Sequence, residues 1–129
     1  MADIYFPPRE LAVMSVLWRL GAVTVAEVRE ALDDDLAYTS VLSALQTLEE
    51  KGYVDHRVEG RAYRYFALVE AERAGGSAIK RIRDAIFQGS AERLFAQLVN
   101  DEGLSRAELE RMRKLLAERL RAADEGSAK

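Results

Sequence analysis

The stretch from residue 36 to residue 68, LAYTSVLSALQTLEEKGYVDHRVEGRAYRYFAL, constrains the fold more than any other part of the chain. Its first half spaces apolar residues three and four apart, which predicts a helix over residues 38–51. Its second half contains two runs rich in β-branched and aromatic residues, 53–58 and 61–68, joined by a tight turn at Glu59-Gly60. A helix followed directly by an arginine-bearing hairpin is the layout of a winged helix-turn-helix, and this layout indicates DNA binding.

Two further helices are predicted in front of this stretch. The first begins at Pro8, because proline suits a first helical position where its missing N–H would have no partner. Apolar residues cover most of its circumference as far as Leu20, so we expect it to be buried on most sides. The second begins after Thr24, which forms a capping box with Glu27. The sequence therefore predicts three helices before the hairpin, as a winged helix requires.

The outer face of the helix over residues 38–51 is made of short polar side chains. At 100° per residue, this face lies opposite the apolar stripe of Val41, Leu45 and Leu48. Hydroxyl and amide groups can approach base edges in the major groove. A helix face of this kind is about as often an ordinary solvent-exposed surface as a DNA-reading one. Its position just before the hairpin favours contact with bases. The residues that we expect to contact bases are Thr39, Ser40, Ser43 and Gln46.

Positive charge is concentrated on and after the hairpin, although the whole chain has a formal net charge of −3. Residues 56–83 hold seven lysines and arginines against three glutamates, whereas residues 1–35 hold three arginines against seven acidic residues. We expect Arg57, Arg61 and Arg64 to hold the phosphate backbone of the DNA.

From residue 70 onward the sequence predicts only helices, with glycines at 75–76, 89 and 103 between them. These helices are amphipathic but short of apolar residues, so we expect two copies of the chain to share one core. The predicted domains are a winged helix over 7–69, an all-helical dimerisation domain over 70–122 and a disordered tail over 123–129. The expected dimerisation residues are Ile82, Ile86, Leu94, Phe95, Leu98, Leu109, Met112 and Leu116.

The residue types that enzymes and metal sites need are scarce. The chain has no cysteine and a single histidine, His56, to which we assign a structural or solvent-facing role. We expect no catalytic residues, no cofactor and no metal, and we interpret Asp33-Asp34-Asp35 as a solvated turn. No apolar run approaches the roughly 18 to 20 residues that span a bilayer, and the N-terminus lacks the features of a signal peptide. We therefore expect a soluble, cytoplasmic protein with no membrane partner.

Four segments in the right order resemble the BlaI/MecI/CopY family of penicillinase, methicillin-resistance and copper-transport repressors. They are PRELAVMSVLW, VTVAEVREAL, AYTSVLSALQTLEEKGYV and HRVEGRAYRY, and the resemblance covers about residues 7–121. It implies a homodimer that represses transcription from a palindromic operator on double-stranded DNA. It also places Thr39, Ser40 and Ser43 in the major groove and Arg57 and Arg61 on the backbone. Relatives often have a basic residue at the position of Thr47. The resemblance therefore puts Thr47 among the expected backbone contacts, but it also implies that one charged phosphate anchor of the family is missing here and that the preferred operator can differ.

Two departures from the family pattern bear on regulation. Copper-responsive members carry a cysteine-rich motif at the C-terminus, so the lack of cysteine excludes copper sensing by that route. Antibiotic-responsive members are cut by a regulatory protease at an Asn-Phe bond, and this bond is absent at the aligned position near Gln97-Leu98. A regulatory protease is therefore an expected partner on the family resemblance alone.

A second function remains open, a winged helix that binds another protein and not DNA. The acidic first third of the chain and Glu49-Glu50 near the end of the polar helix motivate it. The arginines of the hairpin count against it.

Overall fold

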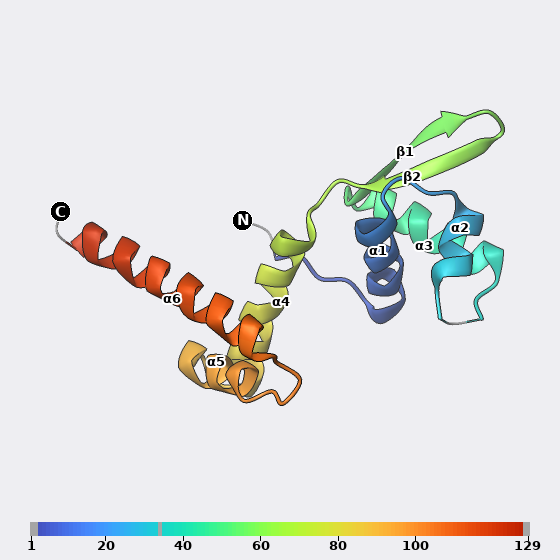
Figure 1. Cartoon of the computed structure of the whole chain (residues 1–129). Helices are drawn as coiled ribbons and strands as arrows, with labels where there is room; N and C mark the ends of the chain where they lie inside the picture. The colour runs from blue at the N-terminus through green and yellow to red at the C-terminus, as the bar shows by residue number, and fades with distance from the viewer. Residues whose placement is uncertain (1–2, 34, 128–129) are drawn as a thin grey trace. The chain divides into compact units, whose positions relative to one another are not determined.

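The computed structural model describes residues 3–33 and 35–127, which form six helices and one two-stranded antiparallel hairpin (Figure 1). The chain divides into two compact units, Met1–Arg81 and Ile82–Lys129. This confirms the predicted class, mainly α with a small β-hairpin in a winged-helix arrangement. The elements are α1 (Pro8–Leu20), α2 (Val25–Ala31), α3 (Tyr38–Glu50), β1 (Val54–Glu59), β2 (Ala62–Ala67), α4 (Ala71–Ile86), α5 (Ala91–Val99) and α6 (Arg106–Ser127).

The first unit packs α1, α2 and α3 around one apolar core, with the hairpin alongside them (Figure 1). Met14 of α1, Val28 of α2, Leu45 and Leu48 of α3, and Val54 of β1 are almost wholly buried. Burying a side chain of this size stabilises the fold by about 1.5–3 kcal/mol. Because α3 commits its Val41, Leu45 and Leu48 stripe to this core, its polar face is left on the outside.

The predicted start of α1 at Pro8 and the capping box of α2 are confirmed. The Thr24 hydroxyl accepts a hydrogen bond from the backbone N–H of Glu27, and the Glu27 carboxylate accepts one from the backbone N–H of Thr24. These bonds satisfy two N–H groups that would otherwise lack partners at the helix start. Within the triplet of aspartates expected as a turn, residue 34 lies outside the described residues.

The hairpin pairs Val54 with Ala67 at its base and Glu59 with Ala62 at its tip. Glu59 is still paired, so the turn comprises Gly60 and Arg61 and lies one residue later than the sequence predicts. Gly60 occupies the left-handed region, with φ +63°, which glycine adopts without strain. Arg61 is consequently at the tip of the wing and not at the start of its second strand.

The base of the hairpin is fixed to the loop that follows α1. Val23 and Tyr65 exchange backbone hydrogen bonds of 3.0 and 2.8 Å across an isolated antiparallel bridge. Both residues are buried. The wing therefore has a rigid base, while its tip projects into solvent.

The boundary between the two units falls between residues 81 and 82, inside α4, whereas the sequence predicted it after residue 69. The cause is the N-terminal segment, which packs on the first part of α4. The backbone N–H of Ile4 donates to the Ser77 hydroxyl at 3.2 Å, and the Arg81 guanidinium donates to Asp3 at 2.8 Å and to the Ile4 carbonyl at 2.7 Å. Gly75-Gly76, expected to separate two helices, lies within α4, where buried Ala74 precedes the glycines and the contacts of Ser77 and Arg81 follow them.

The second unit holds the end of α4 together with α5 and α6, and none of its described residues is buried. Residues 123–127, expected as a disordered tail, continue α6 as far as Ser127. Alanine, leucine, arginine and glutamate dominate the sequence up to residue 125, and these are strong helix formers. Residues 128–129 of the expected tail lie outside the described residues. Over the described ranges, no helix has the combined length and apolar character that crossing a bilayer needs.

Candidate nucleic-acid interface

The exposed face of α3 carries all four residues predicted to contact bases. Thr39, Ser43 and Gln46 are exposed, and Ser40 is partly exposed. Their spacing places Thr39, Ser43 and Gln46 along one ridge of the helix, with Ser40 on the flank nearer α1. The structure therefore brings the predicted base-contacting side chains together on one surface, and their contacts with bases stay a prediction.

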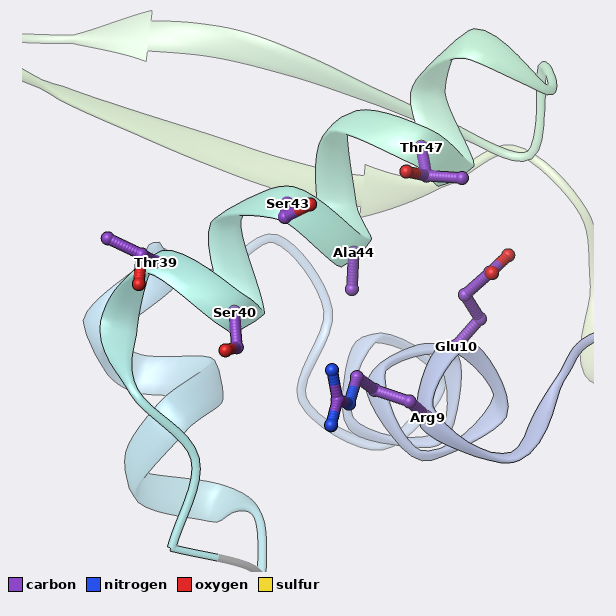
Figure 2. A pocket seen from close by; sticks show the side chains of 7 residues that line it. All are labelled: Arg9, Glu10, Thr39, Ser40, Ser43, Ala44 and Thr47. Carbon is purple, nitrogen blue, oxygen red and sulfur yellow. The ribbon is translucent and has the colours of Figure 1, made fainter.

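Two grooves run along the flanks of this ridge. The groove between α1 and α3, which we call the α1-side groove, is shown in Figure 2. The groove between α3 and the wing, the wing-side groove, brings Gln46 of α3 close to Arg61 of the hairpin turn. The α1-side groove is lined by Arg9, Glu10, Thr39, Ser40, Ser43, Ala44 and Thr47.

The three wing arginines have different surroundings. Arg57 and Arg61 are exposed, and the side chain of neither forms a hydrogen bond or an ion pair with any residue in 3–33 or 35–127. Arg64 is only partly exposed and donates to Glu59 at 2.8 Å, to Glu27 at 3.0 Å and to the Ala22 carbonyl at 3.3 Å. Arg57 and Arg61 are free to meet a phosphate, whereas Arg64 joins the wing to the start of α2. Its predicted contact with the backbone would have to compete with these three acceptors.

Glu27 is the acceptor that links Arg64 to the capping box. The backbone N–H and the hydroxyl of Thr24 lower the pKa of Glu27 below its ordinary value, and the positive charge of Arg64 lowers it further. Glu27 is therefore ionised at neutral pH and holds both the first turn of α2 and the guanidinium of the wing.

A second link joins the wing to α3, and the sequence analysis missed it. The His56 ring and the Glu49 carboxylate form a hydrogen-bonded pair through Nδ1 and Oε1, and the ring stacks on Tyr63 with centroids 4.5 Å apart. Asp55 accepts the backbone N–H of His56 at 2.8 Å. Within the described chain, Glu49, Asp55 and His56 also place ligand atoms within 4.8 Å of one another. Their mutual hydrogen bonds account for this grouping, and we interpret it as a tie between α3 and β1.

Tyr65 is buried next to the Glu49–His56 pair. Burial raises the pKa of Tyr65, and the nearby negative charge of Glu49 raises it further. The phenol therefore stays neutral as part of the core. Glu49 is in α3 and His56 is in β1, so the pair forms only when the chain turns back at Gly52 and β1 packs beside α3. No local sequence motif predicts this pair.

The sequence analysis also did not predict that residues of α1 would line a groove beside α3. Arg9 was counted only as part of an acidic N-terminal third, yet it lines the same groove as Ser40 and Thr47. Glu10, the next residue, forms an ion pair with Lys51 at 2.9 Å. Both residues lie in the first turn of a helix that packs on α3, and this position could have indicated that they lie near the polar face of α3.

The residues predicted to form the dimer interface all lie in α4, α5 and α6, and a single chain does not bury them. Leu94 and Met112 are partly exposed, and the other six are exposed, with exposed fractions from 38% for Leu109 to 59% for Ile86. Their role in a dimer interface stays a prediction.

Comparison with known proteins assigns the chain to a family. The sequence profile of the penicillinase repressor family matches residues 7–118. The transcriptional regulator BlaI of Mycobacterium tuberculosis is 35% identical over 113 residues, which cover 84% of this chain and 80% of that protein. The methicillin resistance regulatory protein MecI of Staphylococcus aureus strain N315 is 23% identical over 109 residues, covering 83% and 89%.

Solved structures with a similar fold are transcription regulators. A MarR family protein from Bacillus stearothermophilus matches with a TM-score of 0.53 and 20% identity, covering 95% of this chain and 78% of its own. A transcriptional regulator from Thermotoga maritima matches with a TM-score of 0.51 and 18% identity, covering 93% and 77%. At these identities the likeness concerns the fold, whereas the family profile covers most of the chain. The chain therefore belongs to the penicillinase repressor family.

Proposed function

We propose that this protein is a DNA-binding transcriptional repressor that acts as a homodimer on a palindromic operator. The observation that carries the proposal is the exposed hydroxyl and amide ridge of α3. It lies beside a wing on which the side chains of Arg57 and Arg61 form no hydrogen bond or ion pair with a described residue. The ridge reads base edges through Thr39, Ser43 and Gln46, with Ser40 on its flank. Arg57, Arg61 and Thr47 hold the backbone and fix the register of the ridge.

The second unit supports the homodimer. Its described residues include no buried side chain, while Phe95, Leu98 and Leu116 are 43%, 52% and 46% exposed. Leaving so much apolar surface in water is costly, at about 25 cal/mol for each Å² that a partner would cover. A second copy of the same unit presents the same apolar stripes, so one interface buries the apolar surface of both chains. A dimer then holds its two reading helices roughly 34 Å apart, or a small multiple of this distance, which matches a palindrome.

Regulation follows from the same arrangement. A protease that cuts inside the second unit would destroy the shared core and leave single winged helices, which bind only half of the operator. The Asn-Phe bond that the family resemblance points to is absent near Gln97-Leu98 of α5, but both of these residues are exposed, so a protease of different specificity could reach the chain there. The operator DNA of a bacterial repressor lies in the cytoplasm, so the protein acts there.

The proposal is tested by DNA selection followed by a binding titration. The protein is used to select duplexes from a random-sequence library. Its affinities for the selected duplexes and for an unrelated duplex are then compared by fluorescence anisotropy at two salt concentrations. A palindromic winner that binds tighter than the unrelated duplex, with affinity falling as salt rises, supports the proposal. Light scattering on the same sample measures the oligomeric state. A folded dimer that binds no duplex at either salt concentration would favour the alternative, a winged helix that binds another protein.

A further inference from the structure

A helix that lies in the major groove meets a phosphate backbone on each of its two flanks. The groove is about 12 Å wide, and an α-helix with its side chains measures about 10–12 Å across. In the proposed function α3 is that helix, so its wing side and its α1 side each face one DNA strand. The wing side has Arg57 and Arg61. The α1 side needs a cation of its own.

Arg9 is the cation on that side. It lies in the first turn of α1 and is exposed, and its side chain forms no hydrogen bond or ion pair within the part of the chain that the structure describes. In Figure 2 its guanidinium points from α1 across the α1-side groove toward Ser40 and Ala44 of α3. The hydroxyls of Ser40 and Thr47 line the same groove and can donate to the same anion.

The acidic neighbour of Arg9 does not cancel this charge. Glu10 also lines the groove, but its carboxylate accepts a hydrogen bond from the Lys51 ammonium at 2.9 Å, and only 15% of its side chain is exposed. Lys51 itself is 42% exposed and adds a positive charge at the C-terminal end of α3. The groove therefore presents one free guanidinium, one paired acid and several hydroxyl donors, a set that suits a phosphate.

We propose that Arg9 binds the phosphate backbone on the α1 side of α3, opposite the wing, so that each subunit holds both strands that border one major groove. This inference rests on the proposed DNA-binding function and adds a residue to it. Arg9 positions α3 from the side that the wing cannot reach, and it carries no base specificity.

The test compares Arg9→Ala with Arg19→Ala, which removes the same charge from an exposed position at the other end of α1. Each variant is titrated with the selected duplex and with an unrelated duplex between about 50 and 200 mM salt. We expect Arg9→Ala to bind both duplexes about tenfold more weakly for each subunit bound at the lower salt concentration, because each subunit loses one charge-assisted contact. The slope of log affinity against log salt should fall by about 0.9 for each subunit bound, while Arg19→Ala keeps the original slope.

Two further measurements separate a direct contact from a change in folding. Arg9→Lys should keep the salt slope but recover only part of the affinity, because an ammonium keeps the charge without the planar fork. Duplexes with single neutral methylphosphonate linkages should locate the contact. At one or two phosphates, the methylphosphonate should lower the affinity of the unaltered protein for the duplex but leave the affinity of Arg9→Ala unchanged. Thermal unfolding of the variants is expected to match the unaltered protein, since Arg9 is exposed.

Equal salt slopes for Arg9→Ala and Arg19→Ala, or no phosphate at which Arg9→Ala has lost sensitivity, would overturn the inference and leave the proposed function standing. If the unaltered protein binds neither duplex, the proposed function itself fails, and the role of Arg9 fails with it.

Discussion

Arg61 and Ser43 lie on the same surface but are expected to affect DNA binding in different ways. Arg61 stands at the hairpin tip, and Ser43 stands on the ridge of α3. Arg61→Ala should weaken binding to all duplexes alike and flatten the salt dependence, because it removes a phosphate contact. Ser43→Ala should instead change the preference at one base-pair position by about 1 kcal/mol. Selection profiles and salt titrations of both variants make this comparison, and indistinguishable profiles would contradict the assigned roles.

Glu27 gives the first unit a contribution to stability that depends on pH. Its folded pKa lies below the unfolded value, so the contribution is present above the unfolded pKa and is lost as pH falls through the folded pKa. Glu27→Gln keeps an acceptor for the capping box but removes the charge that Arg64 and the Thr24 donors favour.

Urea unfolding of the unaltered protein and of Glu27→Gln should therefore differ at neutral pH. The difference should shrink once the pH is below the usual glutamate value. A difference that persists unchanged into acid would show that the charge of Glu27 is not its source.

At the scale of elements, two glycines in different backbone conformations should respond in opposite directions to alanine. Gly52 follows α3 with φ +85°, a left-handed conformation, and nothing lies within 4 Å of an added Cβ. Gly76 lies inside α4, where an added Cβ also meets open space. Gly52→Ala should cost about 1 kcal/mol, because alanine is strained there. Gly76→Ala should stabilise α4 by about 0.5–1 kcal/mol.

Thermal or urea unfolding of the two alanine variants measures both effects. Each substitution adds one methyl group in open space, so each serves as the control for the other. Destabilisation by both would mean that backbone conformation is not the deciding term.

The elements show what can be read from local sequence and what cannot. Pro8, the Thr24–Glu27 pair and the 3–4 spacing of Val41, Leu45 and Leu48 predict three helices correctly, because caps and periodicity act within one helix. The turn at Gly60-Arg61 was misplaced by one residue, since cross-strand pairing and not composition sets it. The boundary inside α4 was missed because the contacts of Asp3 and Ile4 with Arg81 span more than seventy residues.

The candidate site divides in the same way. The residues of the α3 ridge were predicted because they share one helix, whose period fixes their common face. The sequence could not predict that Arg64 has hydrogen-bond partners while the Arg9 side chain has none among the described residues. Each outcome depends on which element packs beside the arginine.

At the scale of the whole molecule, the proposed dimer should depend on the apolar side chains of the second unit. Leu116→Glu places a charge on α6 at a side chain that is 46% exposed in the single chain. In a shared core this charge would be buried without a partner, which costs several kcal/mol and should give monomers. Leu20→Glu, at a side chain that is 51% exposed in the first unit, is the matched control and should leave the dimer intact.

Light scattering reports the oligomeric state, and anisotropy with the selected duplex reports binding. We expect monomeric Leu116→Glu to lose most of its affinity for the full palindrome. A Leu116→Glu protein that remains dimeric would place the interface elsewhere.

The two units are joined within α4, so the connection between them consists of hydrogen-bonded helix. A flexible linker would absorb an extra amino acid with little effect. One alanine inserted after Arg81 would instead add one residue to the helix, which is about 1.5 Å of rise and about 100° of turn along α4 itself. The hydrogen-bonding ladder of α4 therefore continues without a break from one unit into the next, so an insertion at this point lengthens a helix and not a loop.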